Sequence, residues 1–240
     1  MDYKEVCGRF TFPSSFGFTT KQDEIIATFE EELISKLAPK RPGLSIRSRA
    51  KEPEYLLIIN VKKEPLLFNI DMKDVAFSLG EVGEKIDLKH HGSIAALYTT
   101  SLINALEKVV GNRPLIGYSV TSKQILDLNN LKNYELLSAL VPNLVSGNGL
   151  FTHLPGKPYE VQRADFDCTL FDKKNDLEYR IKLQAPSNDM WRKLWYEFTV
   201  RSREEQICNP NILNNLEATI QSVEQGQDFL HHLLEQDKRI

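Results

Sequence analysis

The chain has few cysteines, and none of them is spaced for a familiar site. Cys7, Cys168 and Cys208 are odd in number and widely separated, and no Cys-x-x-Cys pair occurs. A disulfide framework and a cysteine-based zinc site therefore have no support in the sequence. A reducing compartment fits this pattern best, and we predict a cytoplasmic location, either in the producing cell or in a host cell.

The chain also lacks long apolar runs and a strong excess of charge of either sign. No stretch approaches the roughly 18–20 apolar residues of a membrane span, and the charged N-terminus does not resemble a secretory signal. The net charge of −3 gives no broad attraction to nucleic acid or to an anionic membrane. We therefore expect neither nucleic acid nor membrane as a partner.

Nucleotide-binding glycine motifs are missing as well. Gly147-Asn148-Gly149 does not have the spacing of a phosphate loop or of a dinucleotide fingerprint. The sequence thus predicts no cofactor and no metal.

The sequence does contain a clear succession of strands and amphipathic helices. In the first half, alternating residues predict a strand over Val6–Phe12, and the fourfold spacing of apolar residues predicts a helix from Thr20 to Leu37. A second helix is expected to begin at Ser93, which is a suitable N-cap residue. Four strands are expected between these helices, over residues 44–49, 55–61, 66–70 and 75–79.

The second half follows a similar order. A strand over 115–121 and a short helix over 131–141 come first, followed by a loop rich in glycine and proline over 146–158. The last helix is expected to open at Asn209-Pro210, because proline is favoured at the first helical position. Three strands are predicted before it, over residues 159–171, 177–183 and 194–200.

Together these elements predict an α+β protein with a mainly antiparallel sheet backed by about four helices. The order suggests two tandem β-α-β-β-β-α halves, 1–111 and 112–240. Because the link from Gly111 to Pro114 is too short for independent motion, we expect one compact body over residues 1–240.

Asp165 and Asp167 form the sharpest chemical pattern. Carboxylates two residues apart on a strand share a face, as in the two-metal sites of nucleotidyl and phosphoryl transferases, and Glu178 could supply a third ligand. A structural role is the simpler interpretation. If Phe171 and Asp176 close a hairpin, Asp167 lies opposite Arg180 and Asp165 opposite Lys182, as cross-strand ion pairs on a solvated face.

The histidines give weaker patterns. His91, Gly92 and Ser93 stand at the expected helix start, where backbone amides favour an anion. His90 and His91 are adjacent, so they do not share a helical face, and no nearby Asp, Glu or Cys completes a metal-ligand spacing. His153 is a candidate because it lies within the glycine- and proline-rich loop.

An aromatic and basic group marks the last predicted strand. The alternation of this strand turns Trp195 and Arg201 away from the core face. Arg192 lies just before the strand, and Trp and Arg are the residues most enriched at protein-binding hot spots. These three residues are the candidate partner surface.

We therefore predict an intracellular protein-interaction module, such as an adaptor, an inhibitor or immunity protein, an assembly factor or an effector, and we favour a non-catalytic role. Two alternatives remain open. One is a metal-dependent transferase that uses Asp165, Asp167 and Glu178. The other is a small-molecule-binding domain with its pocket between the sheet and the last helix.

Overall fold

The fold is described from a computed structural model. The residues it describes are 3–13, 18–37, 43–51, 54–62, 64–80, 88–127, 166–174, 176–184, 193–202, 212–223 and 226.

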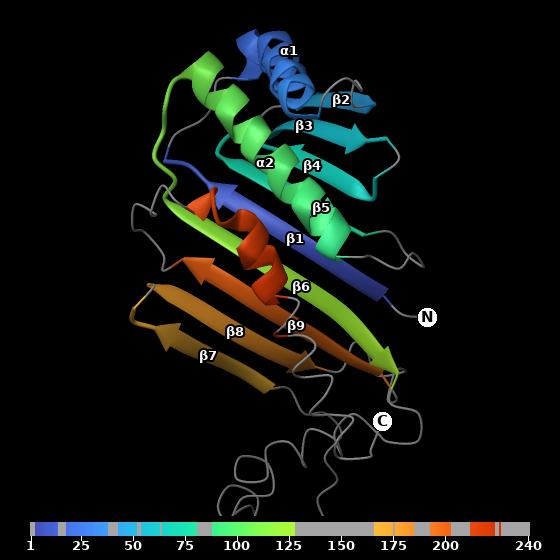
Figure 1. The fold of residues 1–240 in the computed structure, drawn as a ribbon, viewed down its shortest axis with the longest axis vertical. Helices are drawn as coiled ribbons and strands as arrows, with labels where there is room; N and C mark the ends of the chain where they lie inside the picture. Colours follow the sequence, from blue (N-terminus) through green and yellow to red (C-terminus); the bar gives the residue numbers. More distant parts are fainter. Residues whose placement is uncertain are drawn as a thin grey trace, which may run out of the picture.

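One antiparallel sheet organises the described part of the chain. It has nine strands in the order β2-β3-β4-β5-β1-β6-β9-β8-β7. The N-terminal strand therefore lies in the interior of the sheet, paired with β5 on one side and β6 on the other (Figure 1). Strand β2 forms one edge and β7 the other. The strands are β1 Tyr3–Thr11, β2 Leu44–Lys51, β3 Glu54–Val61, β4 Leu66–Ile70, β5 Asp74–Leu79, β6 Gly117–Asp127, β7 Phe166–Asp172, β8 Leu177–Gln184 and β9 Lys193–Ser202.

Three helical segments lie on the same face of this sheet, which we call the inner face (Figure 1). Helix α1 spans Phe18–Leu37 and helix α2 spans Leu88–Val110; both lie over the half of the sheet that contains β2 to β5. The third segment, helical over residues 216–223, lies over the β6 and β9 half. This arrangement confirms an α+β fold with a large antiparallel sheet.

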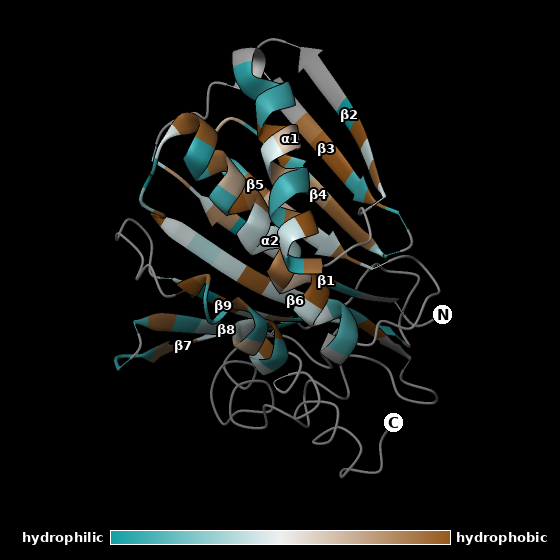
Figure 2. Ribbon diagram, turned by 45° about the horizontal axis from the view of Figure 1, so that its top comes forward, coloured by the Kyte–Doolittle hydropathy of each residue, from teal (hydrophilic) through white to brown (hydrophobic). Residues whose placement is uncertain are grey.

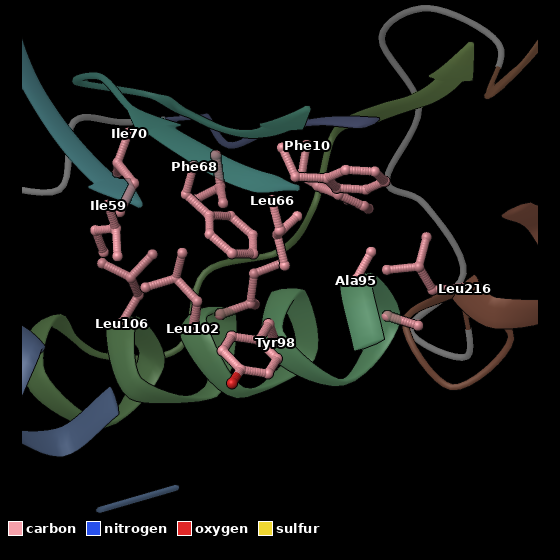
Figure 3. Packing of buried hydrophobic residues seen from close by; sticks show 14 of the residues in the cluster. Phe10, Ile59, Leu66, Phe68, Ile70, Ala95, Tyr98, Leu102, Leu106 and Leu216 are labelled. Atoms are coloured by element: carbon pink, nitrogen blue, oxygen red, sulfur yellow. The ribbon is translucent and has the colours of Figure 1, made fainter. Parts of the chain in front are cut away.

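The core forms between the helices and the inner face, because strand side chains alternate between the two faces. Figure 2 shows hydrophobic segments on β3 and β4 beneath the helices. In Figure 3, Phe68 points from its strand toward Tyr98 and Leu102 of α2. Phe29 of α1 packs edge-on against both Phe68 and Tyr98, with ring centroids 6.4 and 6.3 Å apart.

Gly8 allows a close approach within this core. It lies opposite Phe77 on β5. A Cβ atom at position 8 would stand 2.1 Å from Cε1 of that ring. The ring therefore occupies the space of a missing side chain.

Two predicted boundaries were wrong. Helix α1 begins at Phe18, before the expected cap at Thr20, and α2 begins at Leu88, so Ser93 lies inside the helix instead of capping it. Gly92 is kept within α2 because the third helical segment comes close to it: a Cβ at position 92 would lie 3.1 Å from Cγ2 of Ile220.

The hairpin of β7 and β8 forms with a shifted register. Asp172 and Leu177 are its closing pair, in place of the expected Phe171 and Asp176. Asp176 has a φ of 54° and belongs to the turn, a conformation that aspartate tolerates better than most residues. The shift moves each predicted partner by two residues, so the faces of the strands are unchanged.

Several predictions lie outside the described residues. These are the helix over 131–141, the loop over 146–158, the first part of the strand predicted from residue 159, and the opening of the last helix at Pro210. Within the described residues, no helix is both long and apolar enough to cross a membrane.

Candidate functional site

The sheet face opposite the three helical segments carries most of the polar chemistry among the described residues. We call it the outer face. It is formed by alternate residues of the strands, which lie between the core positions. Its members include Glu5, Cys7, Arg9, Thr11, Leu67, Asp74, Ser78, Ser119, Thr121, Lys123, Ile125, Asp167, Glu178, Arg180, Lys182, Trp195, Glu197, Thr199 and Arg201.

A row of alternating charges crosses the second half of the outer face. Successive strand partners in this row are Glu5, Lys123, Glu197, Lys182 and Asp167. The Nζ of Lys123 lies 3.8 Å from Oε2 of Glu5, and Oε1 of Glu5 accepts a 2.7 Å hydrogen bond from the hydroxyl of Ser78. Each charge thus has an opposite charge beside it, so the row presents no single sign to a partner.

Arginine and carboxylate pairs extend this network. Arg180 donates to both carboxylate oxygens of Asp167, at 2.8 Å through Nε, and this bond holds the pKa of Asp167 below its usual value. Asp167 is therefore paired with Arg180 as predicted, although Lys182 is the residue directly opposite it. Arg9 similarly pairs with Asp74.

Trp195 lies at one end of β9 on the outer face. Its neighbours Leu194 and Tyr196 are fully buried on the inner face, so the predicted alternation is confirmed. The indole Nε1 donates a 2.9 Å hydrogen bond to Oε1 of Glu197, and Ile125 is its direct partner on β6. The side chain is partly buried, and it adds apolar area beside Ile125.

Arg201 lies at the other end of β9, where its Nε donates a 2.7 Å hydrogen bond to Oε2 of Glu178. Beside it is an open hollow of about 530 Å³, lined by Arg9, Thr11, Ser119, Arg201 and Ser202 together with residues 116–118. The lining includes two arginines, Arg9 and Arg201, which pair with Asp74 and Glu178, and hydroxyl-bearing residues such as Ser119. An acidic group of a partner would match that lining.

Trp195 and Arg201 do not form one tight cluster. They are separated by six positions on β9, which is about 20 Å at the usual rise of a strand. They lie instead near opposite ends of β9, on the same face of the sheet. Arg192 lies outside the described residues.

Cys7 lies near the middle of the outer face, between Ser78 and Thr121 of the neighbouring strands. Its pKa rises from 9.0 to about 12, mainly because burial disfavours the thiolate and also because Glu5 is negatively charged. At neutral pH the group is therefore a neutral thiol. Such a thiol is a poor nucleophile.

The register disfavours the transferase alternative. Glu178 lies opposite Phe171, four positions along β7 from Asp167, which corresponds to about 13 Å along a strand. Carboxylates that share a metal pair must lie within a few ångströms of it. Both carboxylates are also paired with arginines. Asp165 lies outside the described residues.

The candidate anion site at the start of α2 is changed by the earlier helix start. Ser93 now lies in the second turn, where its hydroxyl donates to Oε1 of Glu217 from the third helical segment. A carboxylate of the chain itself therefore contacts Ser93, and Gly92 faces Ile220. His153 lies outside the described residues.

Glu64 is a possible metal ligand that the sequence pattern does not reveal. It belongs to the turn between β3 and β4, and the fold brings it to His90 and His91 in the first turn of α2. No local spacing could have revealed this contact, because Glu64 comes from a different element far back in the chain.

Over the described residues of the last helix, 216–223 and 226, the packing does not support the predicted pocket between this helix and the sheet. Leu216, Ile220 and Val223 are fully buried against the core, and a Cβ at Gly226 would lie 2.7 Å from the ring of Phe198. Side chains therefore fill this contact.

Comparisons with known proteins add little. No protein-family model matches the chain, and no curated protein sequence matches it significantly. A solved structure of a rolling circle replication initiator protein from Geobacillus stearothermophilus aligns with 92% of this chain and 79% of its own, at 9% identity and a TM-score of 0.27. A likeness at this level carries no argument about fold or function.

Proposed function

We propose that this chain is a non-catalytic protein-interaction module, and that it binds its partner through the outer face of the sheet. Adaptors, inhibitors or immunity proteins, assembly factors and effectors all belong to this functional class. The observation that carries the proposal is the position of Trp195 and Arg201 on the sheet face opposite the helices, each held by a carboxylate neighbour.

These neighbours make the two side chains suitable anchors. Ordering a long side chain on binding costs about 0.5–1.5 kcal/mol. Glu197 already orients the indole, and Glu178 already orients the guanidinium. Part of that entropic cost is therefore met before a partner arrives, and pre-ordered tryptophan and arginine are typical of hot spots.

The two ends of β9 define what the partner should offer. At the Trp195 end, Ile125 supports an apolar contact. At the Arg201 end, the hollow shared with Arg9 and Ser119 suits a carboxylate or another acidic group. A partner surface with an apolar group and an acidic group about 20 Å apart would match both ends, and an interface of standard size, about 800 Å² on each side, can span that distance.

We further propose that the chain is one body made of two related halves. The strand order supports this proposal. Outward from the central pair of β1 and β6, one side of the sheet runs β1-β5-β4-β3-β2 and the other runs β6-β9-β8-β7. In each half the first strand of the sequence lies next to the last strand of that half. The outer face would then join two equivalent surfaces across β1 and β6.

The proposal is tested with the double variant Trp195→Ala and Arg201→Ala. A partner is first captured from native cells by the wild-type chain and identified, and its affinity is then measured by calorimetry. Since truncating one hot-spot residue costs at least about 2 kcal/mol of binding, the double variant should weaken binding by about 30-fold or more. Its melting temperature should change little, because neither side chain belongs to the core.

The matched control is Glu31→Ala with Ile34→Ala. Like the residues of the outer-face variant, one of these side chains is apolar and the other is charged. Both are exposed on α1, on the helical side of the molecule. They should leave the affinity unchanged. If the control abolishes binding while the outer-face variant binds normally, the partner surface lies on the helices and the proposal is wrong. If Asp167→Asn abolishes a magnesium-dependent activity, the transferase alternative replaces it.

A further inference from the structure

We propose that Glu64, His90 and His91 form a binding site for a divalent transition-metal ion of the zinc type. One ligand atom from each side chain lies within 4.8 Å of the others. This set is independent of the outer face and of the proposed partner surface. It joins the turn between β3 and β4 to the first turn of α2.

The backbone fixes the position of Glu64. Its amide donates to the carbonyl of Val61 at 3.3 Å, which closes the turn after β3, and Pro65 follows with its restricted φ. The Pro65 carbonyl accepts a 3.0 Å hydrogen bond from the amide of Gly80. This hydrogen bond anchors the turn to the end of β5 at the residue next to Glu64.

The histidines come to Glu64 from the helix. The Nε2 of His91 lies 4.0 Å from Oε2 of Glu64, and the rings of His90 and His91 are 5.2 Å apart at 63°. Zinc ligands lie about 2.0–2.2 Å from the ion, so two ligand atoms on one ion are separated by roughly 3–4 Å. The three ligand atoms, which lie within 4.8 Å of one another, are therefore close to that spacing.

The donor set selects the class of ion. Two neutral imidazoles and one carboxylate suit zinc, copper or nickel, whereas magnesium and calcium prefer an all-oxygen shell. Three protein ligands leave a fourth tetrahedral position for water or for a group from another molecule. His90 is exposed and the other two residues are partly buried, so an ion can enter from solvent.

Binding of an ion should stabilise the contact between the β3–β4 turn and helix α2. Glu64 belongs to the β3–β4 turn and the histidines belong to α2, so an ion would hold the turn and the helix together. Glu64 also lies close enough to Tyr98, two turns further along α2, for its charge to raise the pKa of that phenol in addition to the larger effect of burial.

The test uses the full chain without an affinity tag, stripped with a chelator and titrated with zinc chloride by calorimetry. We expect one ion per chain at this site and a rise in melting temperature with zinc concentration, because a ligand that binds the folded state stabilises it. Glu64→Gln and the double variant His90→Ala with His91→Ala should each weaken binding by about tenfold or more, since even outer partners of a metal ligand cost about 10–100-fold.

The matched control is His231→Ala with His232→Ala, which removes the other adjacent pair of histidines in the sequence. It should leave the affinity of the site unchanged. Melting curves in chelator should coincide for wild type and Glu64→Gln, which shows that the near-isosteric variant folds. The proposal is overturned if zinc neither binds nor shifts the melting temperature, if both site variants bind like wild type, or if the control alone abolishes binding.

Discussion

On the inner face of the sheet, side chains such as Phe10 and Phe68 have no solvent exposure. On the outer face, the residues that alternate with such core positions form cross-strand hydrogen bonds and ion pairs, as Arg9 does with Asp74 and Ser78 with Glu5. The same strands supply both faces. The inner face gains stability because its apolar surface is removed from water. This contribution scales with the buried area and depends little on which apolar side chains are in contact. The outer face gains less per residue, because exposed charge pairs contribute about 0–1 kcal/mol each.

This difference separates what each face can do. Substitutions on the inner face change the free energy of unfolding, and they change any function through it. Substitutions on the outer face change which groups are presented at the surface while the fold remains intact. The two faces can therefore be distinguished by neighbouring substitutions on a single strand.

The largest effect is expected from Phe68→Ala compared with Leu67→Ala. Phe68 is fully buried against Phe29, so its truncation should cost about 3–5 kcal/mol of unfolding free energy. Leu67 is the next residue on the same strand but lies on the outer face, and its truncation should cost about 1 kcal/mol or less. Urea unfolding measures both. Equal losses would mean that the two faces do not differ as described.

An intermediate effect is expected from Cys7 at alkaline pH. The folded state keeps the thiol proton up to about pH 12, whereas an unperturbed thiol, as in the unfolded chain, loses it near pH 9.0. Between these values the unfolded state binds fewer protons, so stability falls as the pH rises. Cys7→Ala should remove this part of the decline.

Urea unfolding of wild type and Cys7→Ala at pH 8 and pH 10.5 gives the measurement. Tyrosine and lysine residues titrate in both proteins, so the difference between the two slopes isolates Cys7. Identical slopes would show that the thiol is not desolvated on this face.

The smallest effect is expected from the pair of Asp167 and Arg180. A double-mutant cycle with Asp167→Asn and Arg180→Gln should give a coupling of about 0.2–1 kcal/mol, because both side chains are well exposed. The pKa of Asp167 is lowered in the folded state, so this contribution is present above the ordinary pKa of aspartate and is lost as the pH falls through the folded value. High salt should reduce the coupling and leave the Phe68→Ala loss unchanged. A coupling that does not respond to salt would contradict this account.

Much of the sheet could be predicted from the sequence because alternation records which face a side chain occupies. The strand Leu66–Ile70 was predicted with the observed bounds, and the outward direction of Trp195 followed from the same rule. Turn geometry was harder to predict. Asp176 adopts a positive φ, and this one residue moved the register of the hairpin by two positions.

Contacts between distant elements could not be predicted. The start of α2 was placed too late because Gly92 and Ser93 resemble a helix boundary, whereas tertiary packing against Ile220 favours glycine at that position. The approach of Glu64 to His91 likewise depends on where the β3–β4 turn lies on the folded helix. Patterns along the chain do not carry this information.

The interior position of β1 has a consequence for the order of folding. Strand β1 is synthesised before both of its partners and cannot complete either edge until much later, since the Ser78 to Glu5 hydrogen bond spans 73 residues and Tyr3 pairs with Ile125 later still. At about 5–20 residues per second, synthesis of that much chain takes many seconds, far longer than helix formation. During this interval the edges of β1 are open to other strands, and pairings of such long range are intrinsically slow to form. Helix α1 follows directly after β1 but lies over the half of the sheet that contains β2 to β5 (Figure 1), so β1 depends for its closure on strands that are made much later.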